Sequence, residues 1–142
     1  MQTDHQIRVE QFMRLAEQEI PNTPTIPDSK VLELRARLIM EECLETVRAM
    51  GFDVYTGAQK IDKVWFRKEA GCDLIEVADG CADISVVTIG TLSAFGIKDQ
   101  KLLEEVDAHN LSKFGPGGYK DEGGKWIKPK DLKKPDIFRA IY

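Results

Sequence analysis

The sequence contains few cysteines and no long apolar run. Its three cysteines, Cys43, Cys72 and Cys81, include no Cys-x-x-Cys pair. Such a sparse and odd number argues against a disulfide framework and against a structural zinc site, and it favours a reducing, cytoplasmic compartment. The least polar stretch, residues 84–97, is shorter than the ~20 residues that a membrane span needs, so no membrane partner is expected.

A surplus of basic residues is also lacking. The 142 residues include 20 Lys+Arg and 24 Asp+Glu, which gives a formal net charge of −4. Because little basic charge is available to neutralise a phosphate backbone, nucleic-acid binding is not expected, although a local basic site could hold a small phosphorylated ligand. Length and composition are those of a single globular domain, which we expect to span residues 1–142.

Helical periodicity dominates the residues that are present. It predicts helices over residues 3–20, 28–51, 73–95 and 99–114, and therefore an all-α fold, an antiparallel bundle of about four helices with its core at residues 3–114. Pro21 is expected to end the first helix and Gly96 to cap the third. Residues 52–72 are predicted to be a loop insert, with a short strand pair as the alternative. Residues 115–142 are predicted to be an irregular tail with a small hairpin.

The predicted second helix carries carboxylates where an apolar face should continue. The face that begins with Val31 and Leu34 ends in Glu42 and Glu45, and Glu41 lies on its flank. A second apolar stripe runs along the same helix. A helix that is apolar on two faces is expected to be largely buried, so these acids are predicted to point into the bundle.

The predicted third helix repeats this pattern in the reverse order. Glu76, Asp79 and Asp83 share a face that becomes small and apolar towards Ala94. If the two helices pack antiparallel, both acidic patches lie at the same level. Like charges ~4 Å apart repel by several kcal/mol in a site of low dielectric constant, so the cluster predicts either protonated acids or a divalent cation. Oxygen ligands favour Mg²⁺ or Mn²⁺ over zinc. A single glutamate-rich helix is more often a solvated face, and the argument for a metal depends on the two patterns together.

These acidic residues resemble the signature of the all-α nucleoside triphosphate pyrophosphohydrolases, which include the MazG-like proteins. The E-x-x-E pattern of that superfamily is matched at residues 42–45, and its E-x-x-D pattern at residues 76–79. An N-x-S-K pattern at residues 110–113 resembles the phosphoribosyl-ATP pyrophosphohydrolase-like branch. The resemblance implies Mg²⁺-dependent hydrolysis of a nucleoside triphosphate between its α and β phosphates, with Mn²⁺ as an alternative metal. It also implies assembly as a homodimer or homotetramer.

The resemblance also implies roles for individual residues. The implied metal ligands are Glu42, Glu45, Glu76 and Asp79, with Asp83 as a ligand or as a residue that supports one. Glu41 and Glu42 are the catalytic candidates, and the carboxylate that orients the attacking water is not decided between the acids. Asn110 and Lys113 would hold phosphate oxygens, although a lysine that stabilises the C-terminus of a helix explains Lys113 equally well.

Two alternatives to this reading remain open. One is the phosphoribosyl-ATP pyrophosphohydrolase of histidine synthesis, although the loop insert and the tail depart from its compact pattern. The other is a non-catalytic helical module that binds metal or nucleotide. Candidates for stacking on a nucleobase are Tyr55, Trp65, Phe66 and Trp126, but packing is the better explanation of each.

Overall fold

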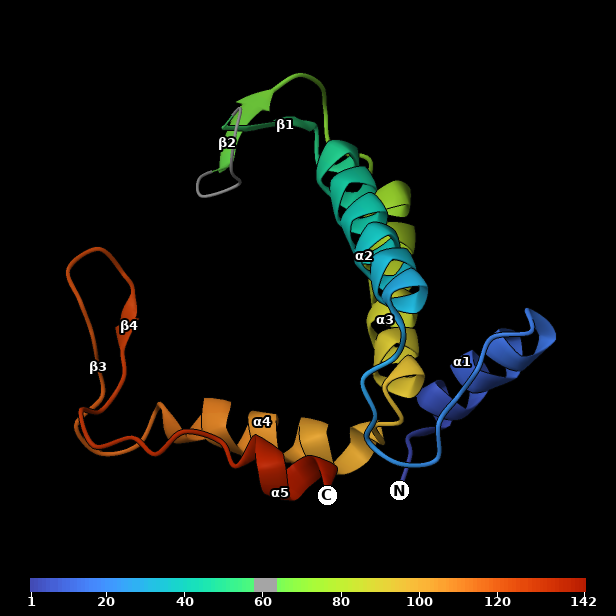
Figure 1. Ribbon diagram of the computed structural model, residues 1–142. Coiled ribbons are helices and arrows are strands. Elements are labelled where there is room, and N and C mark those ends of the chain that lie inside the picture. The colour runs from blue at the N-terminus through green and yellow to red at the C-terminus, as the bar shows by residue number, and fades with distance from the viewer. Residues whose placement is uncertain (58–63) are drawn as a thin grey trace.

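The computed structural model describes residues 1–57 and 64–142, and it is mostly helical (Figure 1). Its helices are α1 (Asp4–Leu15), α2 (Ser29–Ala49), α3 (Leu74–Ala94), α4 (Asp99–Ser112) and α5 (Ile137–Ile141). The strands form two antiparallel pairs, β1 (Phe52–Thr56) with β2 (Val64–Lys68) and β3 (Tyr119–Lys120) with β4 (Trp126–Ile127). The all-α prediction is confirmed, and so are the strand pair in the insert and the hairpin in the tail. Residues 58–63, in the middle of the predicted insert, lie outside the described residues.

Helices α2 and α3 pack against each other as an antiparallel pair (Figure 1). Aspartates start both helices: the Asp28 carboxylate accepts a hydrogen bond from the Val31 amide, and the Asp73 carboxylate accepts from the Ile75 and Glu76 amides. The two backbones approach closely at Gly80, where a Cβ atom would lie 3.0 Å from Cβ of Thr46. A glycine at this position therefore lets the helices come together.

Helix α1 lies against α3 and forms the small apolar core with it. Val9 and Met13 of α1 are buried against Ile89 and Ala94 of α3. The helix ends at Leu15, so the prediction that it continues to residue 20 was wrong. Glu17 adopts a φ of 57°, and the chain turns there well before Pro21. This turn places the side chain of Gln18 against Arg35 of α2, a tertiary contact that helical periodicity cannot reveal.

A buried polar network joins the start of α1 to the corner between α3 and α4. The side chain of Gln6 donates to Ser93 Oγ at 2.9 Å and to the Ile97 carbonyl at 2.8 Å, and it accepts from the Asp99 amide at 3.0 Å. The Asp99 carboxylate in turn accepts from the Thr3 amide at 2.8 Å. Because Gln6 and Asp99 are fully buried and hydrogen-bonded, this network fixes the corner.

Helix α4 leaves the other helices at this corner and runs away from the α2–α3 pair (Figure 1). Its main contacts are with α5, and the tail continues into the β3–β4 hairpin beyond its far end. The three helices α1, α2 and α3 therefore form the bundle, and α4, α5 and the hairpin form an arm, which we call the C-terminal arm. Among the described residues no single helix is long and apolar enough to cross a membrane; α3 and α4 pass that test only as a pair bent by 118°.

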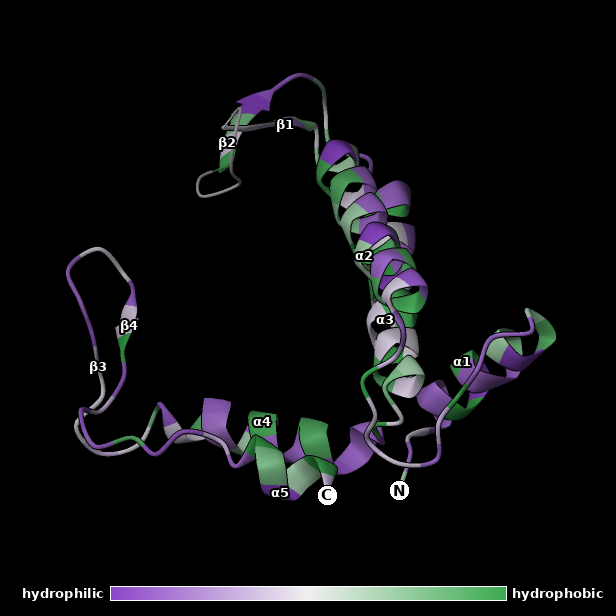
Figure 2. Ribbon diagram, in the orientation of Figure 1, coloured by the Kyte–Doolittle hydropathy of each residue, from purple (hydrophilic) through white to green (hydrophobic). Residues whose placement is uncertain are grey.

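Many apolar side chains of this chain are exposed. Apolar residues cover parts of α4 and α5 in Figure 2, and Leu111, Phe114 and Phe138 are each more than 60% exposed. The prediction that α2 is largely buried was wrong for the single chain, because only Arg35 and Thr46 of this helix are buried. Helix α2 has α3 as its main helical neighbour. Of its second apolar stripe, Leu32, Ala36 and Met50 are exposed, and the remaining members are half-buried.

Candidate functional site

The register of the α2–α3 pair brings the two acidic patches to the same level. Two close contacts define this register: Thr46 lies opposite Gly80, and the guanidinium of Arg35 lies against Gly90. Between these contacts, Glu42 of α2 and Asp83 of α3 line one shared cavity. The predicted convergence of the two patches is therefore confirmed for this part of the site.

The acids influence one another electrostatically. Burial of the Glu42 carboxyl raises its pKa, and the negative charges of Asp83, Glu45, Glu41 and Asp79 raise it further, in that order of size. None of these five carboxylates forms an ion pair with a described residue. The site is thus a concentration of negative charge that no described residue neutralises through an ion pair.

The acids differ in how far they are exposed. Glu42 and Asp83 are half-buried, whereas Glu41, Glu45 and Asp79 are exposed. The prediction that the acids of α2 point into the bundle was therefore wrong for Glu41 and Glu45 in the single chain, since no further helix covers them. Glu76 is exposed as well, and it lies near the end of α2, where the Asp73 amide donates to the Ala49 carbonyl at 2.9 Å.

The donor chemistry of this cluster fits a hard divalent cation. All of its side-chain donors are carboxylate oxygens, which Mg²⁺ and Mn²⁺ prefer. Among residues 1–57 and 64–142, however, no three acidic, histidine or cysteine side chains already converge closely enough to hold a metal ion. The exposed carboxylates would have to adopt other rotamers to bind one.

A cavity extends from the acids towards the other end of the helix pair. It has a volume of about 220 Å³ and lies between α1, α2 and α3. Glu42 and Asp83 line one end, and Arg35 and Gly90 line the other. The walls between them are apolar and include Val9, Phe12, Met13, Leu38, Val86 and Val87. The acidic cluster therefore opens into a largely apolar space that Arg35 and Gln18 also line.

Sequence reasoning missed Arg35 as a member of this site. The side chain is only 5% exposed, and its Nη2 donates to Gln18 Oε1. The available signal was its position, because it precedes Leu38 by three residues and Glu42 by seven and therefore shares their face. An arginine on an otherwise apolar face of a helix is the feature of the sequence that could have identified this residue.

Asn110 and Lys113 lie together at the far end of α4. Lys113 Nζ donates to Asn110 Oδ1 at 2.8 Å, and the Lys113 carbonyl accepts from Trp126 Nε1 at 2.6 Å. The Trp126 ring also packs on Phe114, with ring centroids 5.0 Å apart. Because α4 runs away from the α2–α3 pair, the chain does not bring these two residues to its own acidic cluster (Figure 1).

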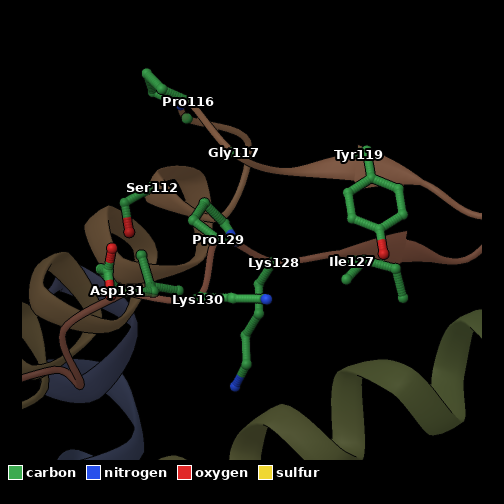
Figure 3. A pocket seen from close by; sticks show the side chains of 11 residues that line it. Ser112, Pro116, Gly117, Tyr119, Ile127, Lys128, Pro129, Lys130 and Asp131 are labelled. Atoms are coloured by element: carbon green, nitrogen blue, oxygen red, sulfur yellow. The ribbon is translucent and has the colours of Figure 1, made fainter.

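The C-terminal arm contains a larger cavity of about 460 Å³ (Figure 3). It lies between the end of α4 and the tail, and Ser112, Tyr119, Lys128 and Lys130 are among the residues that line it. None of the predicted acids lines it. The aromatic candidates Tyr55, Trp65 and Phe66 lie on the β1–β2 pair and do not line the cavity beside the acids either.

Comparison with protein families matches residues 9–110 to the family described as phosphoribosyl-ATP pyrophosphohydrolase. The match begins in α1 and ends in α4, and it includes all six predicted acids, Arg35 and Asn110. Lys113 and the tail lie beyond it. A search of curated proteins finds no match to this chain.

Proposed function

Because the chain belongs to the phosphoribosyl-ATP pyrophosphohydrolase family of the MazG-like superfamily, we propose that it hydrolyses a nucleoside triphosphate between its α and β phosphates. The products are a nucleoside monophosphate and pyrophosphate. The family supports pyrophosphohydrolase activity in general. A common or modified nucleoside triphosphate as the substrate is part of the proposal. The observation that carries it is the set of facing carboxylates on α2 and α3 that have no ion-pair partner among the described residues.

These carboxylates would hold Mg²⁺ or Mn²⁺. The proposed ligands are Glu42, Glu45, Glu76 and Asp79, supported by Asp83. When bound, the cation neutralises phosphate charge and supplies an activated water. Glu41 and Glu42 are the proposed groups that orient this water and accept its proton.

We further propose that the chain acts as a homodimer or homotetramer. The exposed apolar side chains of the C-terminal arm support this, because a contiguous exposed apolar surface is typical of an interface. In such an assembly the arm of one copy would reach the acidic cluster of another. Asn110 and Lys113 would then contact the phosphates of a substrate bound by the partner's acids.

Phosphoribosyl-ATP is a second candidate substrate. The description of the matched family favours it at least as well as a common nucleoside triphosphate. The insert at residues 52–72 and the tail beyond residue 114 depart from a compact helical enzyme, which favours a different substrate. Both candidates contain the same bond between α and β phosphates, so the acids would have the same roles.

The experiment is a screen for pyrophosphate release. Purified protein is incubated with the common nucleoside and deoxynucleoside triphosphates and with phosphoribosyl-ATP, in Mg²⁺, in Mn²⁺ and without metal. We expect metal-dependent release of pyrophosphate and a monophosphate, and loss of roughly 100-fold or more of kcat/KM in Glu45→Gln. Glu33→Gln is the matched control, since Glu33 is an exposed glutamate of α2 that pairs with Arg37.

Three results would contradict the proposal. Release of orthophosphate would mean that another bond is cleaved. Equal activity of Glu45→Gln and Glu33→Gln would remove the acids from the mechanism. Absence of turnover with every substrate, in a folded protein that binds Mg²⁺, would favour the non-catalytic module. Turnover of phosphoribosyl-ATP alone would select the second candidate.

A further inference from the structure

Arg35 is a buried cation without an anionic partner. It is 5% exposed, and it forms no ion pair with a described residue. An arginine carries five N–H donors. The one hydrogen bond of this side chain within the described residues goes from Nη2 to Gln18, and Nε is buried without an acceptor. Burial of an unpaired charge is costly, so this arrangement indicates that an acceptor from outside the chain completes it.

The acceptor would enter through the cavity that contains the acids. Arg35 and Glu42 line opposite ends of this cavity, and they are seven residues apart on one face of α2, which is about 10 Å along the helix. If phosphates are held at the acids, the group that reaches Arg35 is the part of the substrate farthest from them. In a nucleotide this part is the base.

The walls and the volume of the cavity also fit the base of a nucleotide. They are formed by apolar side chains of α1, α2 and α3, and the volume of about 220 Å³ is below the roughly 300–1,000 Å³ of sites that enclose a whole ligand. Gly90 contributes to the space at the Arg35 end, since a Cβ atom there would lie 2.9 Å from Nη1 of Arg35. The cavity is therefore suited to a single planar ring system with an acceptor at its edge.

We propose that Arg35 selects nucleotides whose base carries an oxo group at this edge, with 6-oxopurines preferred over adenine. A 6-oxopurine offers O6 and N7 as two adjacent acceptors, and an arginine binds this pair through two N–H groups. Adenine presents an amino group in place of O6, which would put a donor against the donors of Arg35. This inference rests on the proposed function, because it takes the acids as the phosphate end of the site.

The test measures binding of reaction products, so that it does not depend on turnover. Inosine 5′-monophosphate and adenosine 5′-monophosphate differ at the 6-position, and their dissociation constants are measured by calorimetry in Mg²⁺. We expect inosine monophosphate to bind roughly tenfold or more tightly than adenosine monophosphate. In Arg35→Met we expect this ratio to fall to about one, with little change for adenosine monophosphate.

Controls separate selectivity from folding. Arg37→Met removes an exposed arginine of the same helix and should keep the wild-type ratio. If Arg35→Met does not fold, Arg35→Lys is used instead, because it retains the charge but lacks the planar guanidinium group. It should reduce the preference for inosine monophosphate over adenosine monophosphate, while both monophosphates still bind through their phosphates. Gly90→Ala should weaken both monophosphates by narrowing the cavity next to Arg35.

The outcomes distinguish this proposal from the proposed function. Equal binding of the two monophosphates by the wild-type protein, or a preference for adenosine monophosphate, overturns the role of Arg35. Equal weakening of both by Arg35→Met also overturns it, because the arginine would then hold phosphate or support the fold. A preference for inosine monophosphate without any release of pyrophosphate from triphosphates would leave Arg35 as the selective group and refute the hydrolytic function.

Discussion

The α1–α3 bundle and the C-terminal arm are built in opposite ways. In the bundle, apolar side chains of α1 and α3 cover one another, and a buried polar network fixes the corner to α4. In the arm, α4 has α5 as its main neighbour, and large apolar side chains such as Leu111 and Phe138 are exposed. The difference is that the chain itself covers the apolar side chains of the bundle core and leaves those of the arm exposed. In the proposed assembly a second copy would cover the arm.

The largest effect is expected from a charge introduced on the exposed apolar surface of the arm, which should change the oligomeric state of the protein. Leu111 is 72% exposed, so Leu111→Glu should change the stability of an isolated chain by less than about 0.5 kcal/mol. If α4 lies in an interface between copies, the buried carboxylate should dissociate the assembly. Light scattering after size-exclusion chromatography would then report the mass of a single chain.

The control for this experiment is Lys101→Glu, which changes a charge at an exposed position near the start of the same helix. It should leave the mass of the assembly unchanged. A wild-type protein that is monomeric at micromolar concentrations would contradict the proposal that the arm lies in an interface.

Removing the hydrogen bonds of Gln6 should have the largest effect on the bundle itself. Gln6→Ala leaves Ser93, the Ile97 carbonyl and the Asp99 amide without their partner, and each buried unsatisfied group costs roughly 1–3 kcal/mol. We therefore expect the free energy of unfolding to fall by about 3 kcal/mol in urea denaturation. Gln100→Ala removes a half-buried glutamine whose one side-chain hydrogen bond among the described residues goes to Glu104, and it should cost much less. Equal losses in the two variants would refute the structural role of the network.

Adding a methyl group between α2 and α3 should have a smaller effect on stability and a specific effect on the site. In Gly80→Ala the new Cβ lies 3.0 Å from Cβ of Thr46, so the helices must separate, at a cost of about 2 kcal/mol by analogy with overpacked cores. The separation moves Asp79 and Asp83 away from α2, and stabilisation by Mg²⁺ in thermal melts should decrease. Gly71→Ala is the matched control, since a Cβ there meets no atom within 4 Å. A Gly80→Ala variant with the melting behaviour of Gly71→Ala would show that the contact is not needed.

Local signals in the sequence predicted most of the helix boundaries. Asp28 and Asp73 start α2 and α3 as N-caps, and Gly96, with a φ of 68°, follows the end of α3 as expected. These features depend on neighbouring residues, so the sequence contains them directly. The end of α1 was mispredicted because its turn at Glu17 places Gln18 against Arg35, which is distant in the sequence.

The sequence alone determines the helical character of this chain and the spacing of its acids, because both follow from a period of 3.6 residues along one helix. Only the tertiary structure decided that Arg35 is buried beside the cavity and that α4 leaves the bundle. Both depend on contacts between distant segments, the Gln18–Arg35 bond and the Gln6–Asp99 network, and such contacts leave no periodic pattern in a single sequence.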